Sequence, residues 1–210
     1  MRLKTIGGLW IEGLPASPSL GPRQLALLAV VATAGKKAIS RERLIGILWP
    51  DTGEEQARHT LSQTLYSLRR DAGAELISGT TQLRLDGSVT SDIGELQDAA
   101  AAGDNRTIGA LYTGRFLEGF YLPGAPDFER WVEDERAGLH RLALRAIERL
   151  AKESDEAGDH NEALRWWQAL AGLDPLSARS TTGHMRSLAQ AGDRSGRPWH
   201  CSSSNARRGP

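Results

Sequence analysis

The sequence of 210 residues predicts a mainly α-helical protein with a small amount of β-structure. Three observations lead to this fold class. Residues 1–90 mix short extended segments with amphipathic stretches, residues from 91 onward read as one helix after another, and a tripeptide recurs in the second part at the spacing of helix pairs. The length suffices for one large domain or for two small ones, each with a buried core.

The first part predicts a strand followed by helices. Leu3 to Glu12 are expected to form the strand, with Gly7-Gly8 as a bend. A turn region follows at residues 14–21, and Pro22 then opens the first helix, where the amide N–H that proline lacks would have no partner anyway. Apolar residues at helical spacing predict one buried stripe on this helix: Leu25, Leu28, Ala29 and Ala32.

Two further helices and a hairpin complete the first part. Ser40 is a suitable N-cap for a second helix that ends at Trp49-Pro50. Thr52-Gly53-Glu54-Glu55 matches a capping box, in which the Thr and the second Glu bond each other's backbone amides, and so predicts the start of the third helix. Gly73 is expected to end that helix in a left-handed conformation. Residues 75–85, with turn-forming residues in their middle, predict a hairpin.

The third helix is expected to have one apolar and one polar face. At about 100° per residue, the apolar residues share a narrow face: Ala57, Leu61, Leu65 and Leu68. The other face carries hydrogen-bonding or cationic side chains and no acid: Arg58, His59, Ser62, Gln63, Tyr66, Arg69 and Arg70.

Such a face is typical of DNA recognition, because Arg bonds guanine bidentately and Gln bonds adenine. A long helix followed by a hairpin predicts a winged helix-turn-helix, with the helix in the major groove and the hairpin at the flanking backbone, where Arg84 would reach a phosphate. A solvated face that binds nothing is the alternative for the helix. An ordinary water-exposed strand position is the alternative for Arg84.

The second part predicts successive helices around an aromatic connector. Asp92 is expected to cap the first of them, and Phe128 and Trp131 are expected to pack the long helix against the connector. The predicted segments are helices at about 92–102, 105–112, 127–157, 160–173 and 175–191, with the connector at 116–126.

A repeat of Ala-Gly-Asp at residues 157–159 and 191–193 has the period of tetratricopeptide (TPR) helix pairs. Asp174-Pro175 between the two copies would supply an N-cap and a first-turn proline. We therefore expect TPR-like helical hairpins rather than a chance coincidence of a tripeptide. Pro198 would break any continuation of the array, so residues 194–210 are expected to be a disordered or aberrant tail, with a frameshift or premature end as the hypothesis.

The formal net charge of zero conceals an uneven distribution. Residues 1–90 carry +3, residues 91–193 carry −7, and residues 194–210 carry +4. A single cysteine, Cys201, excludes an internal disulfide framework and a cysteine-based zinc site. Nucleotide-binding glycine loops and the His-Glu-x-x-His motif are absent. We therefore expect a cytoplasmic protein without catalysis, cofactor, metal or membrane span.

Several motifs resemble known regulators. Gly7-Gly8-Leu9, Ser40-Arg41-Glu42-Arg43-Leu44, Leu48-Trp49-Pro50-Asp51 and the segment 61–70 resemble SARP-type bacterial transcriptional regulators. The segments 111–120 and 128–136 look like the matching bacterial transcriptional activator domain.

The resemblance implies an OmpR-like winged helix in residues 1–90 and an activator domain in residues 91–193. Proteins of this type bind double-stranded promoter DNA, commonly as dimers, and help RNA polymerase start transcription. On that implication the helix of residues 54–70 is the recognition helix, and a homodimer is possible. The rival interpretation is a protein-interaction module whose winged helix no longer binds DNA.

Overall fold

The computed structural model describes residues 1–14 and 20–192 and is mainly helical with two small sheets, as the sequence predicts. The chain forms two compact units, and the second begins at Ile147, within helix α6 (Pro126–Glu156). Part of the predicted turn region (residues 15–19) and the predicted tail (194–210) lie outside the described residues.

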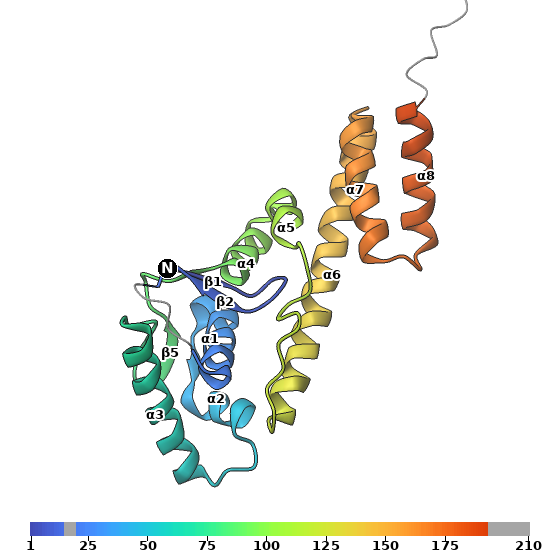
Figure 1. Cartoon of the computed structure of the whole chain (residues 1–210). Helices are drawn as coiled ribbons and strands as arrows, with labels where there is room; N and C mark the ends of the chain where they lie inside the picture. The colour runs from blue at the N-terminus through green and yellow to red at the C-terminus, as the bar shows by residue number, and fades with distance from the viewer. Residues whose placement is uncertain (15–19, 193–210) are drawn as a thin grey trace, which may run out of the picture. The chain divides into compact units, whose positions relative to one another are not determined.

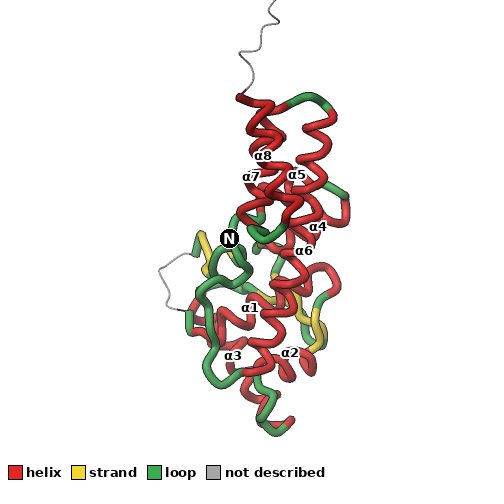
Figure 2. The backbone as a smooth tube through the Cα atoms, turned by 90° about the vertical axis from the view of Figure 1, so that its right-hand side faces the viewer, coloured by secondary structure: helices red, strands yellow, loops and turns green. Residues whose placement is uncertain are grey.

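The N-terminal segment forms two strands rather than the single predicted one; Figure 1 labels them, and Figure 2 colours all strands yellow. Strand β1 (Arg2–Lys4) pairs antiparallel with β2 (Trp10–Glu12) and parallel with β6 (Thr90–Ser91). The chain reverses between β1 and β2, where Gly7 has φ +82°, a conformation that favours glycine. A local pattern of alternating residues does not distinguish one bent strand from two paired ones.

Helix α1 (Pro22–Ala34) is the centre of the first unit (Figure 1). It begins at Pro22 as predicted, and the side-chain Oε1 of Gln24 accepts a hydrogen bond from the backbone N–H of Gly21 at 2.7 Å. The predicted single stripe was wrong, because every residue from Ala26 to Ala32 is buried while Leu25 is only half-buried. The helix contacts α2, α3, α4 and β5, so its whole circumference faces protein.

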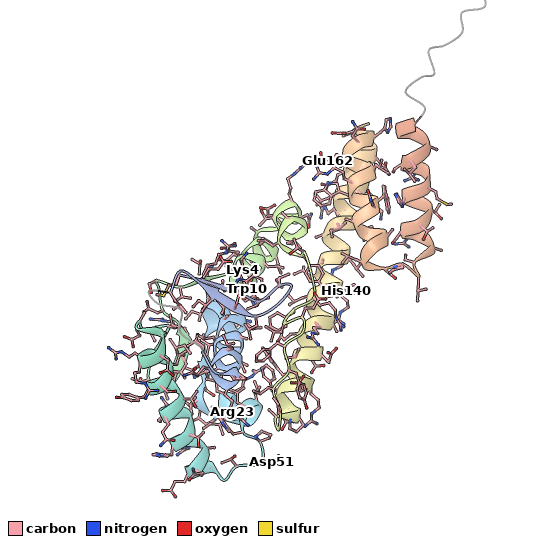
Figure 3. The ribbon with its side chains drawn as sticks, viewed as in Figure 1. Lys4, Trp10, Arg23, Asp51, His140 and Glu162 are labelled. Carbon is pink, nitrogen blue, oxygen red and sulfur yellow. The ribbon has the colours of Figure 1, made fainter. Side chains whose placement is uncertain are left out.

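Helix α2 (Arg41–Leu48) starts and ends as the sequence predicts. The hydroxyl of Ser40 accepts a hydrogen bond from the backbone N–H of Arg43 at 3.2 Å, which confirms the N-cap. At the other end Arg23, labelled in Figure 3, donates to the carbonyl of Leu48 at 2.7 Å and lies 5.8 Å from the centre of the Trp49 ring. These contacts fasten the end of α2 to the start of α1.

The predicted hairpin is confirmed as β4 (Ile77–Ser78) and β5 (Gln82–Leu85), joined by a turn at Gly79. A side chain at Gly79 would collide with the backbone oxygen of Gln82, so only glycine fits there. A short strand, β3 (Ile39–Ser40), follows the 3₁₀ turn η1 (Gly35–Lys37) and pairs antiparallel with the other edge of β5. The hairpin is thereby joined to the segment that leads into α2.

Helix α4 (Asp92–Ala102) is capped by Ser91 and not, as predicted, by Asp92. Asp92 is buried instead, and its carboxylate accepts hydrogen bonds from the backbone N–H and hydroxyl of Thr5 and from the N–H of Ile6, at 2.6 to 3.1 Å. The carboxylate thus satisfies two amides that lie beyond the end of β1. It ties the N-terminal sheet to α4, which leads into α5 (Asn105–Leu111).

The aromatic connector packs against the first turns of α6, as predicted. Phe116 and Phe128 are fully buried, and the ring centres of Phe116 and Trp131 lie 5.8 Å apart at 78°. Arg136 donates to the carbonyls of Phe116 and Leu117, both at 2.7 Å. The connector is therefore held by aromatic contacts and by hydrogen bonds to its backbone.

The second unit contains α7 (His160–Leu173) and α8 (Ala178–Gly192), which lie side by side as a helical hairpin. The predicted bounds of α7 are confirmed. Helix α8 begins at Ala178, so Pro175 is not in its first turn as predicted; the hydroxyl of Ser177 accepts from the N–H of Ser180 at 3.3 Å. Asp174-Pro175 belongs to the preceding turn, where the carbonyl of Asp174 accepts from the N–H of Ser177.

Candidate nucleic-acid interface

Helix α3 (Glu54–Ala72) carries seven of the eight residues predicted to contact DNA. Its N-cap is Gly53, without a side-chain cap, so the predicted capping box of Thr52 was wrong. Thr52 belongs to the preceding turn, where its N–H bonds the carbonyl of Trp49 at 3.2 Å. The helix ends at Gly73 in the predicted left-handed conformation, with φ +65°. Acids in the first turn and Arg69 and Arg70 in the last complement the helix dipole.

The two faces of α3 separate as the sequence predicts. Ala57, Leu61 and Leu68 are at most 2% exposed. Leu65 departs from the prediction, because it is half-buried and lines a cavity beside the hairpin. All seven polar residues are exposed: Arg58, His59, Ser62, Gln63, Tyr66, Arg69 and Arg70. Figure 3 shows side chains extending from the outer side of this helix.

The C-terminal half of α3 is anchored to α1 through Gln24. The side-chain amide of Gln24 donates to the hydroxyl of Ser67 at 3.1 Å and to the carboxylate of Asp71 at 2.9 Å. Arg70 donates to the same carboxylate at 2.8 to 2.9 Å. The hydrogen bond from Gln24, followed by that from Arg70, lowers the pKa of Asp71 below its ordinary value. The charge of Arg70 is therefore matched within the protein.

Other polar residues of this face also have partners on the same helix. Arg58 pairs with Glu54, one turn earlier, at 2.6 Å. The side chains of His59 and Gln63 are hydrogen-bonded at 2.8 Å. Among the residues that the structure describes, Arg69 forms no ion pair. Arg58 and Glu54 are exposed and lie one helical turn apart, and such a pair contributes only about 0.3–0.5 kcal/mol, so a phosphate can displace Glu54 from Arg58.

The hairpin lies beside the second half of α3, and the two elements share a cavity of about 220 Å³. Leu83 is buried toward this side, whereas Arg84, the next residue of β5, is exposed on the opposite side of the strand. The structure thus places Arg84 on the hairpin, as the sequence predicts, and not on α3. The cavity is lined by Leu65, Tyr66, Leu68, Arg69, Glu75, Leu76, Ile77, Gly79 and Leu83.

Arg41 joins the hairpin to α3, a role that the sequence did not reveal. Its guanidinium donates to the carbonyl of Thr80 in the turn at 3.2 Å and to the hydroxyl of Ser62 at 2.9 Å. Its backbone N–H bonds the carbonyl of Thr81 at 3.3 Å. The only local signal is that Arg41 follows the N-cap Ser40, and nothing near it in sequence points to residue 62.

The contacts of Ser62 restrict what it can recognise. Its hydroxyl donates to the carbonyl of Arg58 at 3.0 Å while it accepts from Arg41. Because a hydroxyl has one proton and two lone pairs, Ser62 has one acceptor site left for an external donor.

Residues 82–196 match the family of the bacterial transcriptional activator domain, which is more than half of the chain. The chain belongs to this family. The match begins at the first residue of β5 and includes all of α4 to α8. The name of the family indicates a role in transcriptional activation. No curated protein matches the chain.

The part of the chain that the structure describes has neither a membrane-spanning helix nor a cluster of metal-binding side chains. No helix among residues 1–14 and 20–192 combines the length and apolar character needed to span a bilayer. The same residues contain no cluster of three or more His, Cys, Asp or Glu side chains arranged to hold a metal ion.

Proposed function

We propose that this protein is a sequence-specific DNA-binding transcriptional activator. Residues 1–90 act as an OmpR-like winged helix, and residues 91–193 act as a TPR-like activator domain that contacts RNA polymerase or other partners. The observation that carries the proposal is the division of α3 into a buried leucine face and an exposed face of seven polar or cationic residues. The family membership supports the transcriptional role.

The contacts on α3 indicate how each residue would act. Arg69 lies near the end of the helix without an ion pair among the described residues, so its charge is available to DNA at no cost in protein contacts. Arg58 and Arg70 would exchange their carboxylates for phosphate or guanine. Gln63 would release His59 to bond adenine. Arg41 would keep the hairpin, and with it Arg84, at a fixed distance from α3.

The proposal extends to the setting in which the protein works. It places the protein in the cytoplasm, without catalysis and without a resident cofactor or metal. Binding to two half-sites in a promoter would favour a homodimer, because each half-site binds one recognition helix and each copy of the chain supplies one.

The test is a gel shift with the genomic fragments that the purified full chain retains, at two salt concentrations. Arg69→Ala, Arg70→Ala and Gln63→Ala should each weaken binding by about 1–3 kcal/mol, and loss of a phosphate contact should reduce the salt slope by about 1. Arg141→Ala, an exposed cation on α6, is the control and should bind as the parent does. Unchanged binding by the three variants would contradict the assignment of α3.

A second candidate function is a protein-interaction module with a DNA-inactive winged helix. The observation in its favour is that Arg58 and Arg70 are already paired with acids. This alternative predicts that no genomic fragment is retained at low salt, whereas the activator predicts a selected, salt-sensitive subset.

A further inference from the structure

A second cavity, of about 470 Å³, lies within the first unit on elements other than α3. Its volume falls in the range of about 300–1,000 Å³ that small-molecule sites occupy. Apolar side chains line part of it, among them Val30 of α1, Ile39 of β3 and Ile47 of α2. Trp131 and Glu135 contribute the indole and a carboxylate from α6.

Charged groups of both signs line this cavity, and none of them forms an ion pair among the described residues. Lys37 and Arg43 line it and are exposed, and neither forms an ion pair among the described residues. Glu135 is half-buried, and burial raises the pKa of its carboxyl group; a hydrogen bond from Trp131 and the charge of Arg43 oppose the shift only in part. The carboxylate therefore lies in a partly desolvated position without a counter-ion at contact distance.

The backbone at the rim of the cavity is strained. Ala38 has φ +55° and ψ 175°, beside a region of backbone conformation that is essentially reserved for glycine. Ala38 lies between Lys37 and Ile39, which both line the cavity. Strain of this kind persists only where the surrounding structure imposes it, and it is concentrated at functional sites.

We propose that this cavity binds a small zwitterion, namely an α-amino acid with a large apolar side chain. The carboxylate of the ligand would pair with Lys37 and Arg43, and its ammonium group with Glu135. The apolar side chain would lie against Ile39, Ile47 and the indole of Trp131. An organic anion would leave Glu135 without a partner, and an organic cation would leave the two basic residues without one.

The cavity is placed to affect the proposed DNA interface. Arg43 belongs to α2, which contacts α3, and Gln82, another lining residue, belongs to β5 of the hairpin. A ligand that joins α2 and β5 to α6 would restrict the elements that hold α3. This second step rests on the proposed function, whereas ligand binding itself does not.

Calorimetric titration of the full chain with three related probes tests the ligand class without DNA. L-phenylalanine carries both charged groups, 3-phenylpropanoate lacks the ammonium group, and phenethylamine lacks the carboxylate. We expect L-phenylalanine to bind at one site and each of the other two to bind at least about tenfold more weakly, because each leaves a charged group of the site unpaired. Equal binding of 3-phenylpropanoate, or no binding of any probe, would overturn the proposal.

Variants locate the binding. Arg43→Gln, Lys37→Gln and Glu135→Gln should each weaken L-phenylalanine binding at least about fivefold. Asp134→Asn and Arg141→Gln, exposed neighbours on α6 that do not line the cavity, should leave binding unchanged. Equal losses in the control variants, with circular dichroism spectra like the parent's, would place the ligand elsewhere and reject this site.

The regulatory step has a separate readout. Saturating L-phenylalanine should change the affinity for retained genomic DNA at least about threefold, and Arg43→Gln should abolish the change. Ligand binding with an unchanged DNA affinity would refute the coupling alone. Ligand binding by a protein that retains no DNA would refute the proposed function and leave the ligand site intact.

Discussion

Helices α3 and α8 are both amphipathic, but they bury opposite kinds of side chain. Helix α3 buries Leu61 and Leu68 and exposes its cations. On α8 the buried positions are small or polar, Ser180, Gly183 and Ser187, while Met185 and Leu188 are 67% and 49% exposed. Burial of apolar side chains therefore orients α3, whereas the close approach of its backbone to α7 orients α8.

The contacts of Trp167 explain the orientation of α8. Gly183 lies so close to the indole that a Cβ atom would collide with the ring. The indole N–H donates to Asp155 at 2.9 Å, and Arg186 of α8 donates to the same carboxylate oxygen at 2.7 Å. One face of α8 is therefore fixed by a missing side chain and an ion pair, and its apolar residues remain on the outside.

The largest effect should come from the apolar face of α3. Leu61→Ala removes a fully buried side chain and should lower the free energy of unfolding by about 2–5 kcal/mol. Tyr66→Ala, on the exposed side of the same helix, should change it by no more than about 0.5 kcal/mol. Urea denaturation followed by circular dichroism measures both, and similar losses would contradict the assignment of the two faces.

A smaller effect is expected on the face of α8 that contacts α7. Gly183→Ala places a Cβ atom against the Trp167 ring and should destabilise the second unit by about 1–3 kcal/mol. Gly172→Ala in α7 has open space at its Cβ and should instead stabilise the helix by up to about 1 kcal/mol. Hydrogen exchange of α7 and α8 amides measures the difference. If Gly183→Ala were as stable as the parent, close packing would not orient α8.

The anchoring of α3 to α1 should depend on pH. The pKa of Asp71 is lowered in the folded protein, first by Gln24 and then by Arg70. A lowered pKa contributes stability that is present above the unfolded value of about 3.9 and is lost as pH falls through the folded value. Asp71→Asn should therefore be less stable than the parent at pH 6, and the gap should close toward pH 2.5. A gap that is constant with pH in urea titrations would contradict the ionic contribution.

The smallest effect is expected on the outer side of α8. Leu188→Gln should leave the free energy of unfolding within about 0.5 kcal/mol of the parent, because half of this side chain already contacts water. Thermal denaturation is the measurement, with Leu170→Gln of α7, 3% exposed, as the destabilised comparison. A loss for Leu188→Gln equal to that for Leu170→Gln would mean that α8 buries its apolar side after all.

Much of the local structure could be predicted from the sequence. The bounds of α7, the N-cap at Ser40, the hairpin around Gly79 and the glycine that ends α3 all depend on residues within about four positions of one another. The exposure of the seven polar residues of α3 was also predictable, because it follows from helical periodicity alone.

Contacts between residues far apart in the sequence could not be predicted in this way. Asp92 bonds Thr5, 87 residues earlier, instead of capping its own helix. Arg41 reaches Ser62, and α1 is buried all round because four other elements surround it. Local sequence patterns report backbone preferences and the direction of side chains around one helix or strand. They do not report which other element accepts a hydrogen bond from a side chain or covers a face of a helix. That other element determines the contacts of Asp92 and Arg41 and the burial of α1.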